Sequence, residues 1–154
     1  MLARVRRLLV PALAPVLLLA SGCSVLYGTP FTVTTDVMAP LAPQGATVYW
    51  RPGARPNRGD VIFYTLPNDP ANSTIGRVVA LPGETVAITG GKVLVNGQPI
   101  DDSKANGPTA DLPSSKVPDE SFFVLGDNRA TKQDSRTFGP VDRMLLQGIV
   151  SHPK

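Results

Sequence analysis

Hydrophobic and polar residues alternate in short runs along most of the chain, and this pattern predicts β-strands. Gly90-Gly91 and Asn96-Gly97 lie between or just after such runs and supply the positive φ angles that tight hairpin turns need. Glycine, proline, asparagine and aspartate separate the other runs, which is typical of an all-β domain. We therefore expect a mainly β fold built on antiparallel sheet. The apolar or β-branched runs are Phe31–Thr35, Ala46–Trp50, Val61–Leu66, Ile75–Leu81, Thr85–Thr89, Val93–Asn96 and Phe122–Leu125.

Two segments depart from this alternation. Ile100–Ser121 is polar and rich in Asp, Ser, Lys and Pro, so we expect a long exposed loop there. Val141–Gln147 predicts one short helical turn. The 16 Pro and 14 Gly among 154 residues leave no stretch long enough for a helix bundle. The hydrophobic fraction of 42% is sufficient for a packed core, so wholesale disorder is excluded.

The first 22 residues have the pattern of an export signal. Met1–Arg7 is basic, and Leu8–Ala20 is a run of thirteen apolar residues followed by small ones. That run is shorter than the roughly 20 residues needed to span a bilayer core. Ala20-Ser21-Gly22-Cys23 resembles the bacterial lipoprotein signal, which implies that Cys23 is lipidated and begins the mature chain. An ordinary secretory signal with an incidental cysteine remains the alternative.

These boundaries divide the chain into a signal peptide over 1–22, a lipid-anchored linker over 23–30 and a β domain over 31–151. The domain is then expected outside the cytoplasm, tethered to the outer leaflet of the cell membrane or to the outer membrane. The formal charge of +3 comes from Arg4, Arg6 and Arg7, because twelve basic and twelve acidic residues balance from Cys23 onward. Without a basic surplus on the domain, nucleic-acid binding has no support.

Three polar motifs follow one another within the β region. They are Arg58–Ile62, Arg77–Glu84, and the pair Gly126-Asp127-Asn128-Arg129 and Asp134-Ser135-Arg136. The last pair offers two carboxylates and two guanidiniums within ten residues, directly after an apolar strand. That composition suits a buried or half-buried ion-pair network that locks a loop against a sheet.

The order and spacing of these motifs resemble the type I signal peptidase family, which are serine peptidases with a Ser-Lys dyad. The resemblance implies a signal-peptidase-like β fold whose groove binds an extended substrate segment as an added strand. It also implies cleavage of secretory signals from exported proteins at the membrane surface. A serine attacks the carbonyl and a neutral lysine takes its proton, so the resemblance implies no metal and no other cofactor.

The segment that matches the family's nucleophile departs from the family pattern. Met38 and Pro40 fall in register, and the position of the serine is Val37. The lysine immediately precedes Arg77 in the family, and here that residue is Gly76. Valine has no oxygen that could attack a carbonyl, and glycine has no amine. Loss of such a unit typically lowers turnover roughly 10⁴–10⁶-fold.

A relocated dyad is a second hypothesis. Thr35 keeps a hydroxyl where the family has its first serine, and Lys132 lies where many members carry a serine beside the catalytic lysine. The simpler interpretation is that Thr35 is a strand residue and Lys132 a solvated loop lysine. Three functions therefore stay open: a silent relative that binds an extended peptide or exported protein, an active peptidase that uses Thr35 and Lys132, and a structural envelope lipoprotein.

Overall fold

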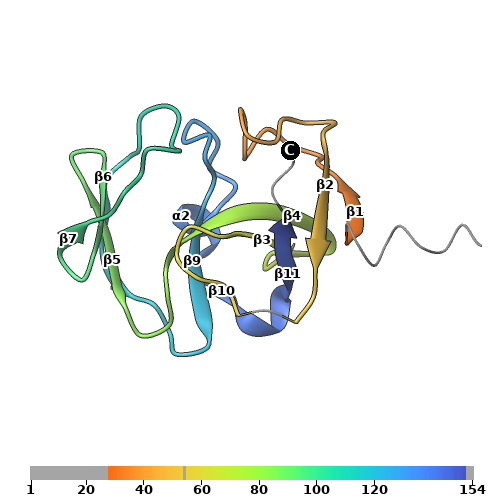
Figure 1. Ribbon diagram of the computed structural model, residues 1–154. Helices are drawn as coiled ribbons and strands as arrows, with labels where there is room; N and C mark the ends of the chain where they lie inside the picture. The colour runs from red at the N-terminus through yellow and green to blue at the C-terminus, as the bar shows by residue number, and fades with distance from the viewer. Residues whose placement is uncertain (1–27, 54, 152–154) are drawn as a thin grey trace, which may run out of the picture.

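The computed structural model describes residues 28–53 and 55–151, which fold into two antiparallel β-sheets (Figure 1). The predicted export signal and Cys23 lie outside the described residues. The larger sheet has the strand order β1-β2-β11-β3-β4-β9-β10 and the smaller one the order β7-β6-β5-β8. The strands are β1 (Thr29–Thr32), β2 (Thr47–Arg51), β3 (Val61–Leu66), β4 (Asp69–Ala80), β5 (Thr85–Thr89), β6 (Lys92–Val95), β7 (Gln98–Pro99), β8 (Leu112–Lys116), β9 (Ser121–Leu125), β10 (Val141–Asp142) and β11 (Leu146–Ser151).

Two tight turns build the smaller sheet. Gly90 and Gly91 have φ angles of 56° and 77° between β5 and β6, and Asn96 and Gly97 have φ angles of 52° and 78° between β6 and β7. Two successive positive φ angles match the turn geometry that suits the twist of a hairpin. The resulting registers pair Thr89 with Lys92 and Val95 with Gln98. Both predicted hairpin turns are confirmed.

Strand β4 is twelve residues long, and its two edges are paired with other strands over different stretches. One edge pairs with β3 from Asp69 to Arg77, with a register shift before Asp69, whereas the other edge pairs with β9 only from Arg77 to Ala80. On the edge away from β3, the described residues provide no partner strand for Pro70–Gly76. Figure 1 shows β4 as a long arc that runs from beside β9 towards the β1–β2 side of the fold.

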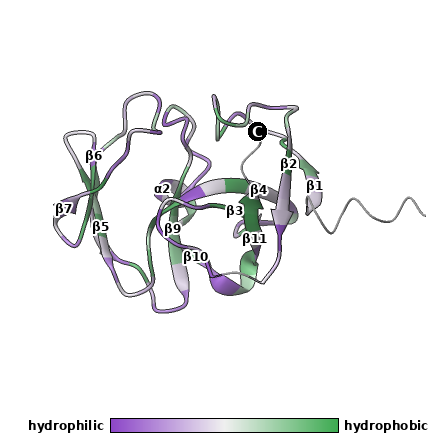
Figure 2. Ribbon diagram, in the orientation of Figure 1, coloured by the Kyte–Doolittle hydropathy of each residue, from purple (hydrophilic) through white to green (hydrophobic). Residues whose placement is uncertain are grey.

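Buried apolar side chains form three clusters. Figure 2 colours β11 as hydrophobic, whereas β2, in which buried and exposed residues mix, is pale. The first includes Val37 and Met38 and packs against β2 and β3. The second fills the space between the smaller sheet and β9. The third covers the opposite face of β3, β4 and β9 and includes Tyr64 and Val124, with Phe138 packed against it. These clusters fix the β4–β9 pair between apolar layers. The second motif begins on β4, and the third directly follows β9.

The helices of the described chain are very short. Helix α2 (Ser135–Phe138) begins at Asp134, whose side chain accepts a hydrogen bond from the Arg136 N–H, and ends at Gly139 with φ of 83°. A 3₁₀ turn, η1 (Arg143–Leu145), begins after Asp142. No helix within residues 28–53 and 55–151 has the length and apolar character needed to cross a bilayer.

The structure corrects three of the predicted elements. The run Phe31–Thr35 is a strand only as far as Thr32, where β1 ends, so Thr35 is not a strand residue. The expected loop Ile100–Ser121 contains β8, which pairs with β5 so that Lys116 lies opposite Thr85. Four of its five residues are exposed, so no apolar alternation marks it as a strand. The expected helical turn Val141–Gln147 is instead β10, the 3₁₀ turn η1 and the start of β11. In the last two places pairing with a distant strand decides the conformation.

Candidate functional site

A buried ion pair between Arg77 and Asp127 brings the three motifs together. The Arg77 Nε and Nη2 atoms donate to the two oxygens of Asp127 at 2.7 and 2.5 Å. The Nη1 atom donates to the carbonyl oxygen of Gly59 at 2.7 Å. The side chains of Arg77 and Asp127 are 12% and 3% exposed, and the hydrogen bond to Asp127 raises the pKa of Arg77. A single guanidinium therefore fixes the positions of the first, second and third motifs.

A second pair, between Asp134 and Arg136, folds the third motif onto itself. The Asp134 Oδ2 atom accepts from the Gly126 N–H at 3.0 Å and from Arg136 Nη2 at 2.7 Å. Arg136 Nη1 also donates to the carbonyl oxygen of Arg129 at 3.0 Å. Ser135 Oγ accepts from a buried main-chain N–H of β9 at 3.0 Å, so its hydroxyl serves the packing of the loop.

The third motif also holds the polar segment that precedes β8. Arg129 is buried and forms an ion pair with Asp102, and its Nη1 donates to Thr109 Oγ1 at 3.0 Å. The Asn106 N–H donates to the Asp127 carbonyl at 2.7 Å, and the Asn106 carbonyl accepts from the Arg129 N–H at 2.8 Å. The sequence analysis missed Asp102. A buried arginine requires a carboxylate partner, but several aspartates in this polar segment could have supplied it.

The segment around Val37 lies directly on the third motif. The Asn128 N–H donates to the Val37 carbonyl at 3.1 Å, and Asn128 Nδ2 donates to the Asp36 carbonyl at 3.1 Å. The Asp127 N–H donates to Met38 Sδ at 3.4 Å. Val37 is 1% exposed, and Met38 is fully buried. The serine-equivalent position is therefore closed and apolar, while Pro40 lies exposed in the following turn.

Gly76 lies near the same end of β9 as Val37. A Cβ atom on Gly76 would lie 2.5 Å from Val124 Cγ1, and a Cβ atom on Gly126 would lie 2.6 Å from Val37 Cγ2. Val124 and Gly126 are two residues apart, or about 7 Å along an extended strand. The two dyad-equivalent positions therefore lie near the same end of β9. Val37 packs in the first apolar cluster, whereas the side-chain neighbours of Gly76 belong to the third.

Thr35 and Lys132 are placed differently. The Thr35 hydroxyl is buried and has no hydrogen-bond partner among the described residues. Lys132 is exposed and lines a surface hollow of about 450 Å³ together with Leu66 and Asp69, at the turn from β3 to β4. Within the described chain no hydrogen bond joins the two side chains, so the Thr35–Lys132 dyad stays a prediction that the geometry does not favour.

Tyr64 was not singled out by the sequence, because a tyrosine inside an apolar strand indicates only a core position. Its ring is fully buried and packs 6.4 Å from the Phe138 ring, and its hydroxyl has no partner among the described residues. Burial, followed by the negative charge of Asp134, raises the pKa of Tyr64 above the ordinary value of 10.0. The hydroxyl also lies 3.4 Å from the place of a Cβ atom on Gly76.

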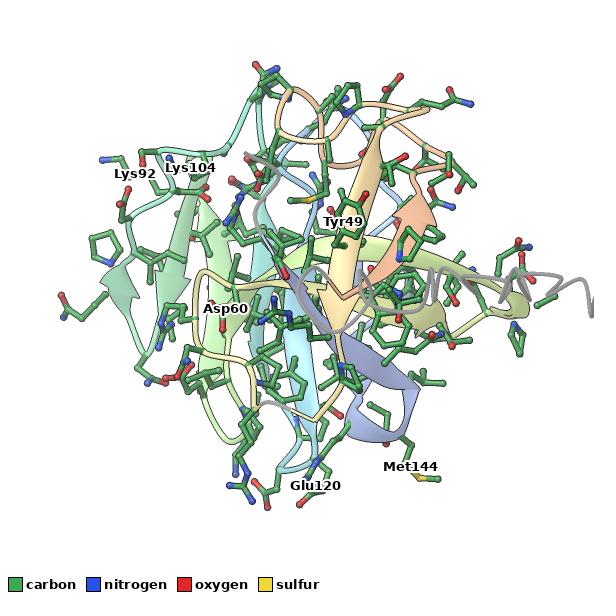
Figure 3. The ribbon with its side chains drawn as sticks, turned by 45° about the vertical axis from the view of Figure 1, so that its right-hand side comes forward. Tyr49, Asp60, Lys92, Lys104, Glu120 and Met144 are labelled. Carbon is green, nitrogen blue, oxygen red and sulfur yellow. The ribbon has the colours of Figure 1, made fainter. Side chains whose placement is uncertain are left out.

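We also searched the described residues for a metal-ion site. Within the described ranges no three His, Cys, Asp or Glu side chains gather into a metal-ion site. The exposed ionic side chains that Figure 3 labels, such as Lys92, Lys104 and Glu120, lie towards the rim of the molecule, away from the core of the sheets.

We expect Asp127→Asn to lower the free energy of unfolding by roughly 3–5 kcal/mol, because it leaves the half-enclosed Arg77 charge without its partner. Urea denaturation at neutral pH measures this change. Glu120→Gln is the matched control, since the Arg143–Glu120 pair is exposed at 53% and 71% and spans 3.4 Å. The control should change the free energy by less than about 1 kcal/mol. Equal effects of the two substitutions would contradict the central role of the Arg77–Asp127 pair.

We expect Tyr64→Phe to make the protein more resistant to alkali. The folded state favours the neutral phenol of Tyr64, so its contribution to stability is complete below the ordinary pKa of 10.0 and is lost as the pH rises towards the raised pKa. Above pH 10 the wild type should lose up to about 1.4 kcal/mol per pH unit through this group. Urea denaturation between pH 9 and pH 11 measures the slope. Equal slopes in the wild type and Tyr64→Phe would contradict this expectation.

Comparison with known proteins gives a consistent result. The family model described as "Signal peptidase, peptidase S26" matches residues 6–153. A probable signal peptidase I-1 of Synechocystis is 32% identical over 93% of this chain and 78% of its own length. A signal peptidase I of Leptolyngbya laminosa is 43% identical over 60% of this chain. That match covers 50% of the relative's own length.

The fold agrees with a solved structure as well. The crystal structure of a signal peptidase I from Enterococcus faecalis superposes with a TM-score of 0.58 at 29% identity. The superposition covers 64% of this chain and 98% of that chain. The mainly β architecture predicted from the strand pattern is therefore confirmed. With the family match running through nearly the whole chain, this protein belongs to the signal peptidase family, peptidase S26.

Proposed function

We propose that this protein is a catalytically silent member of the signal peptidase family that binds an extended peptide or protein segment. The proposal places the domain on the extracytoplasmic side of a bacterial membrane, held there by a lipid on Cys23. The observation that carries it is the combination of an unpaired edge on β4 with dyad-equivalent positions that hold no reactive group.

The proposed lack of peptidase activity follows from the chemistry of the site residues. A peptide carbonyl brought to position 37 would meet a buried valine side chain, and no nucleophilic oxygen is present there. Position 76 holds glycine, so no amine is available to take a proton. The Thr35 hydroxyl is buried without a base beside it. Nucleophilic catalysis by a hydroxyl requires such a base within hydrogen-bond reach.

The binding capacity follows from the main chain of β4. The Val78 N–H donates to the Asp60 carbonyl on the β3 side, and hydrogen-bonding residues alternate along an antiparallel strand. The main-chain groups of Gly76 and Thr74 therefore face β3, and those of Ile75 and Ser73 face away from it. Ile75 is only 1% exposed, whereas Ser73 is half-buried, so the accessible part of this edge begins at Ser73. An extended segment can add to such an edge through main-chain hydrogen bonds, while alternate side chains supply specificity.

The names of the relatives favour a second candidate, an active signal peptidase that processes exported proteins. In this chain it would require Thr35 and Lys132 to act together, and the buried Thr35 hydroxyl weighs against that pairing. A structural envelope lipoprotein without a groove ligand is the outcome expected if the β4 edge binds nothing.

The first test uses the full chain in detergent with a synthetic peptide. Its cleavage positions carry small residues, as the resemblance to the signal peptidase family implies. We expect saturable binding, slower amide hydrogen exchange at Ser73, and no cleavage product by mass spectrometry. Exchange in β8 (Leu112–Lys116) should not change. That strand is the matched control, because it is an exposed strand at the edge of the other sheet.

Two results would contradict the proposal in different directions. A single specific cut that disappears in Lys132→Ala and persists in Lys116→Ala would establish the active peptidase. The absence of both binding and cleavage would instead favour a structural lipoprotein.

The second test concerns the anchor. Metabolic labelling with a fatty-acid analogue should tag the wild type and not Cys23→Ala, because the thiol of Cys23 is the proposed attachment point. Electrophoresis of the labelled chains gives the readout. Labelling of Cys23→Ala at the wild-type level would refute lipidation at this residue, and an unlabelled wild type would indicate an ordinary secretory signal.

A further inference from the structure

We infer that Asn106 is a site of spontaneous deamidation, and that its conversion to isoaspartate releases the polar segment 102–109 from the third motif. The chain contains two Asn-Gly pairs, Asn96-Gly97 and Asn106-Gly107. The structure restrains the side chain of the first asparagine and leaves that of the second exposed. The inference does not depend on the proposed function, because it concerns the covalent chemistry of the main chain.

The reaction needs only the asparagine, the next peptide nitrogen and water. The Gly107 nitrogen attacks the Asn106 Cγ atom, so that an N–Cγ bond forms and the side-chain amide leaves as ammonia with the proton of that nitrogen. Water then opens the resulting five-membered imide, and opening at the α carbonyl gives isoaspartate. Glycine favours the first step because it has no Cβ atom to obstruct the approach.

Asn96 is held in place by the smaller sheet. Its side-chain oxygen accepts a hydrogen bond from the Thr85 N–H at 2.9 Å, and its own N–H donates to the Thr85 carbonyl at 2.8 Å. It also lies in the tight turn between β6 and β7, with a φ angle of 52°. The side chain must give up its bond to Thr85 before the Gly97 nitrogen can attack, and this cost slows the reaction.

The side chain of Asn106 has no such restraint. It is exposed, and within residues 28–53 and 55–151 no hydrogen bond holds its amide or the N–H of Gly107. The main chain of Asn106 is restrained only by an isolated bridge to Asn128, and exposed hydrogen bonds of this kind open at low cost. Neither the attacking nitrogen nor the attacked amide must first give up a hydrogen bond.

Isoaspartate would lengthen the main chain inside a closed loop of contacts. Asp102 and Thr109 are both bound by the guanidinium of Arg129, the first through an ion pair and the second at 3.0 Å. Between them, the Asn106 N–H donates to the Asp127 carbonyl at 2.7 Å, and the Asn106 carbonyl accepts from the Arg129 N–H at 2.8 Å. In isoaspartate the main chain runs through Cβ and Cγ, which adds a methylene group between these anchors. At least one anchor must then be displaced, and the segment loosens from the loop that carries Asp127.

The reaction is tested by incubating the full chain in detergent at pH 8 and digesting samples with trypsin for mass spectrometry. Cleavage after Lys92, Lys104 and Lys116 puts the two asparagines on separate peptides. We expect Asn106 to deamidate at least about tenfold faster than Asn96 in the folded protein, the factor that corresponds to one hydrogen bond of about 1.4 kcal/mol.

Two controls separate the effect of the fold from that of the dipeptide. In the urea-unfolded chain the two asparagines should react at similar rates, because both precede glycine. Asn106→Gln should give no product at that position over the same time, because glutamine would have to close a six-membered ring. Equal rates in the folded protein, or a faster reaction at Asn96, would overturn the inference.

The structural consequence is tested on the isoaspartate form. Ion-exchange chromatography isolates it, because the product carries an additional negative charge, and fragmentation of the Cα–Cβ bond that has joined the main chain identifies it. We expect amide hydrogen exchange at Arg129 to be at least about tenfold faster than in the unmodified chain. Exchange at Thr85, whose N–H is bound by Asn96, should not change. Unchanged exchange at Arg129 in the isoaspartate form would overturn the release of the segment.

Discussion

The Arg77–Asp127 ion pair is the interaction on which the rest of this structure depends. It connects the central strand β4 with the loop that follows β9, and the same guanidinium also holds the Gly59 carbonyl before β3. Removing one partner from such a buried pair leaves a charge without compensation, which is far more costly than losing an exposed pair. The three motifs are therefore constrained together by the stability of the fold.

This constraint explains how family motifs persist in a chain whose dyad positions are Val37 and Gly76. The carboxylates of Asp127 and Asp134 are used by Arg77, Arg136 and the Gly126 N–H, all of which brace the β4–β9 region. None of these contacts requires a nucleophile or a base. The scaffold and the chemistry are thus separable, and retention of the fold carries no guarantee of the reaction.

Peptide binding and peptide hydrolysis make different demands on this scaffold. Binding along β4 needs accessible main-chain groups on its unpaired edge, and the offset between the β3 and β9 pairings leaves that edge free at the half-buried Ser73. Hydrolysis needs an oxygen and an amine within hydrogen-bond reach, in an open space. Here Val37 and Gly76 supply neither group, which supports the proposal that the chain binds peptides without cleaving them.

The sequence alone determined the mainly β class, the two hairpin turns and the full extent of β3 and β5, because side-chain alternation and positive-φ dipeptides act over a few residues. It also showed which residues stand at positions 37 and 76. Only the tertiary structure decided that exposed residues form β8, that Asp102 is the partner of Arg129, and that Thr85 holds the side chain of Asn96 while that of Asn106 is exposed. These outcomes depend on strand register and on contacts between residues far apart in the chain, and local patterns of polarity carry no information about such contacts.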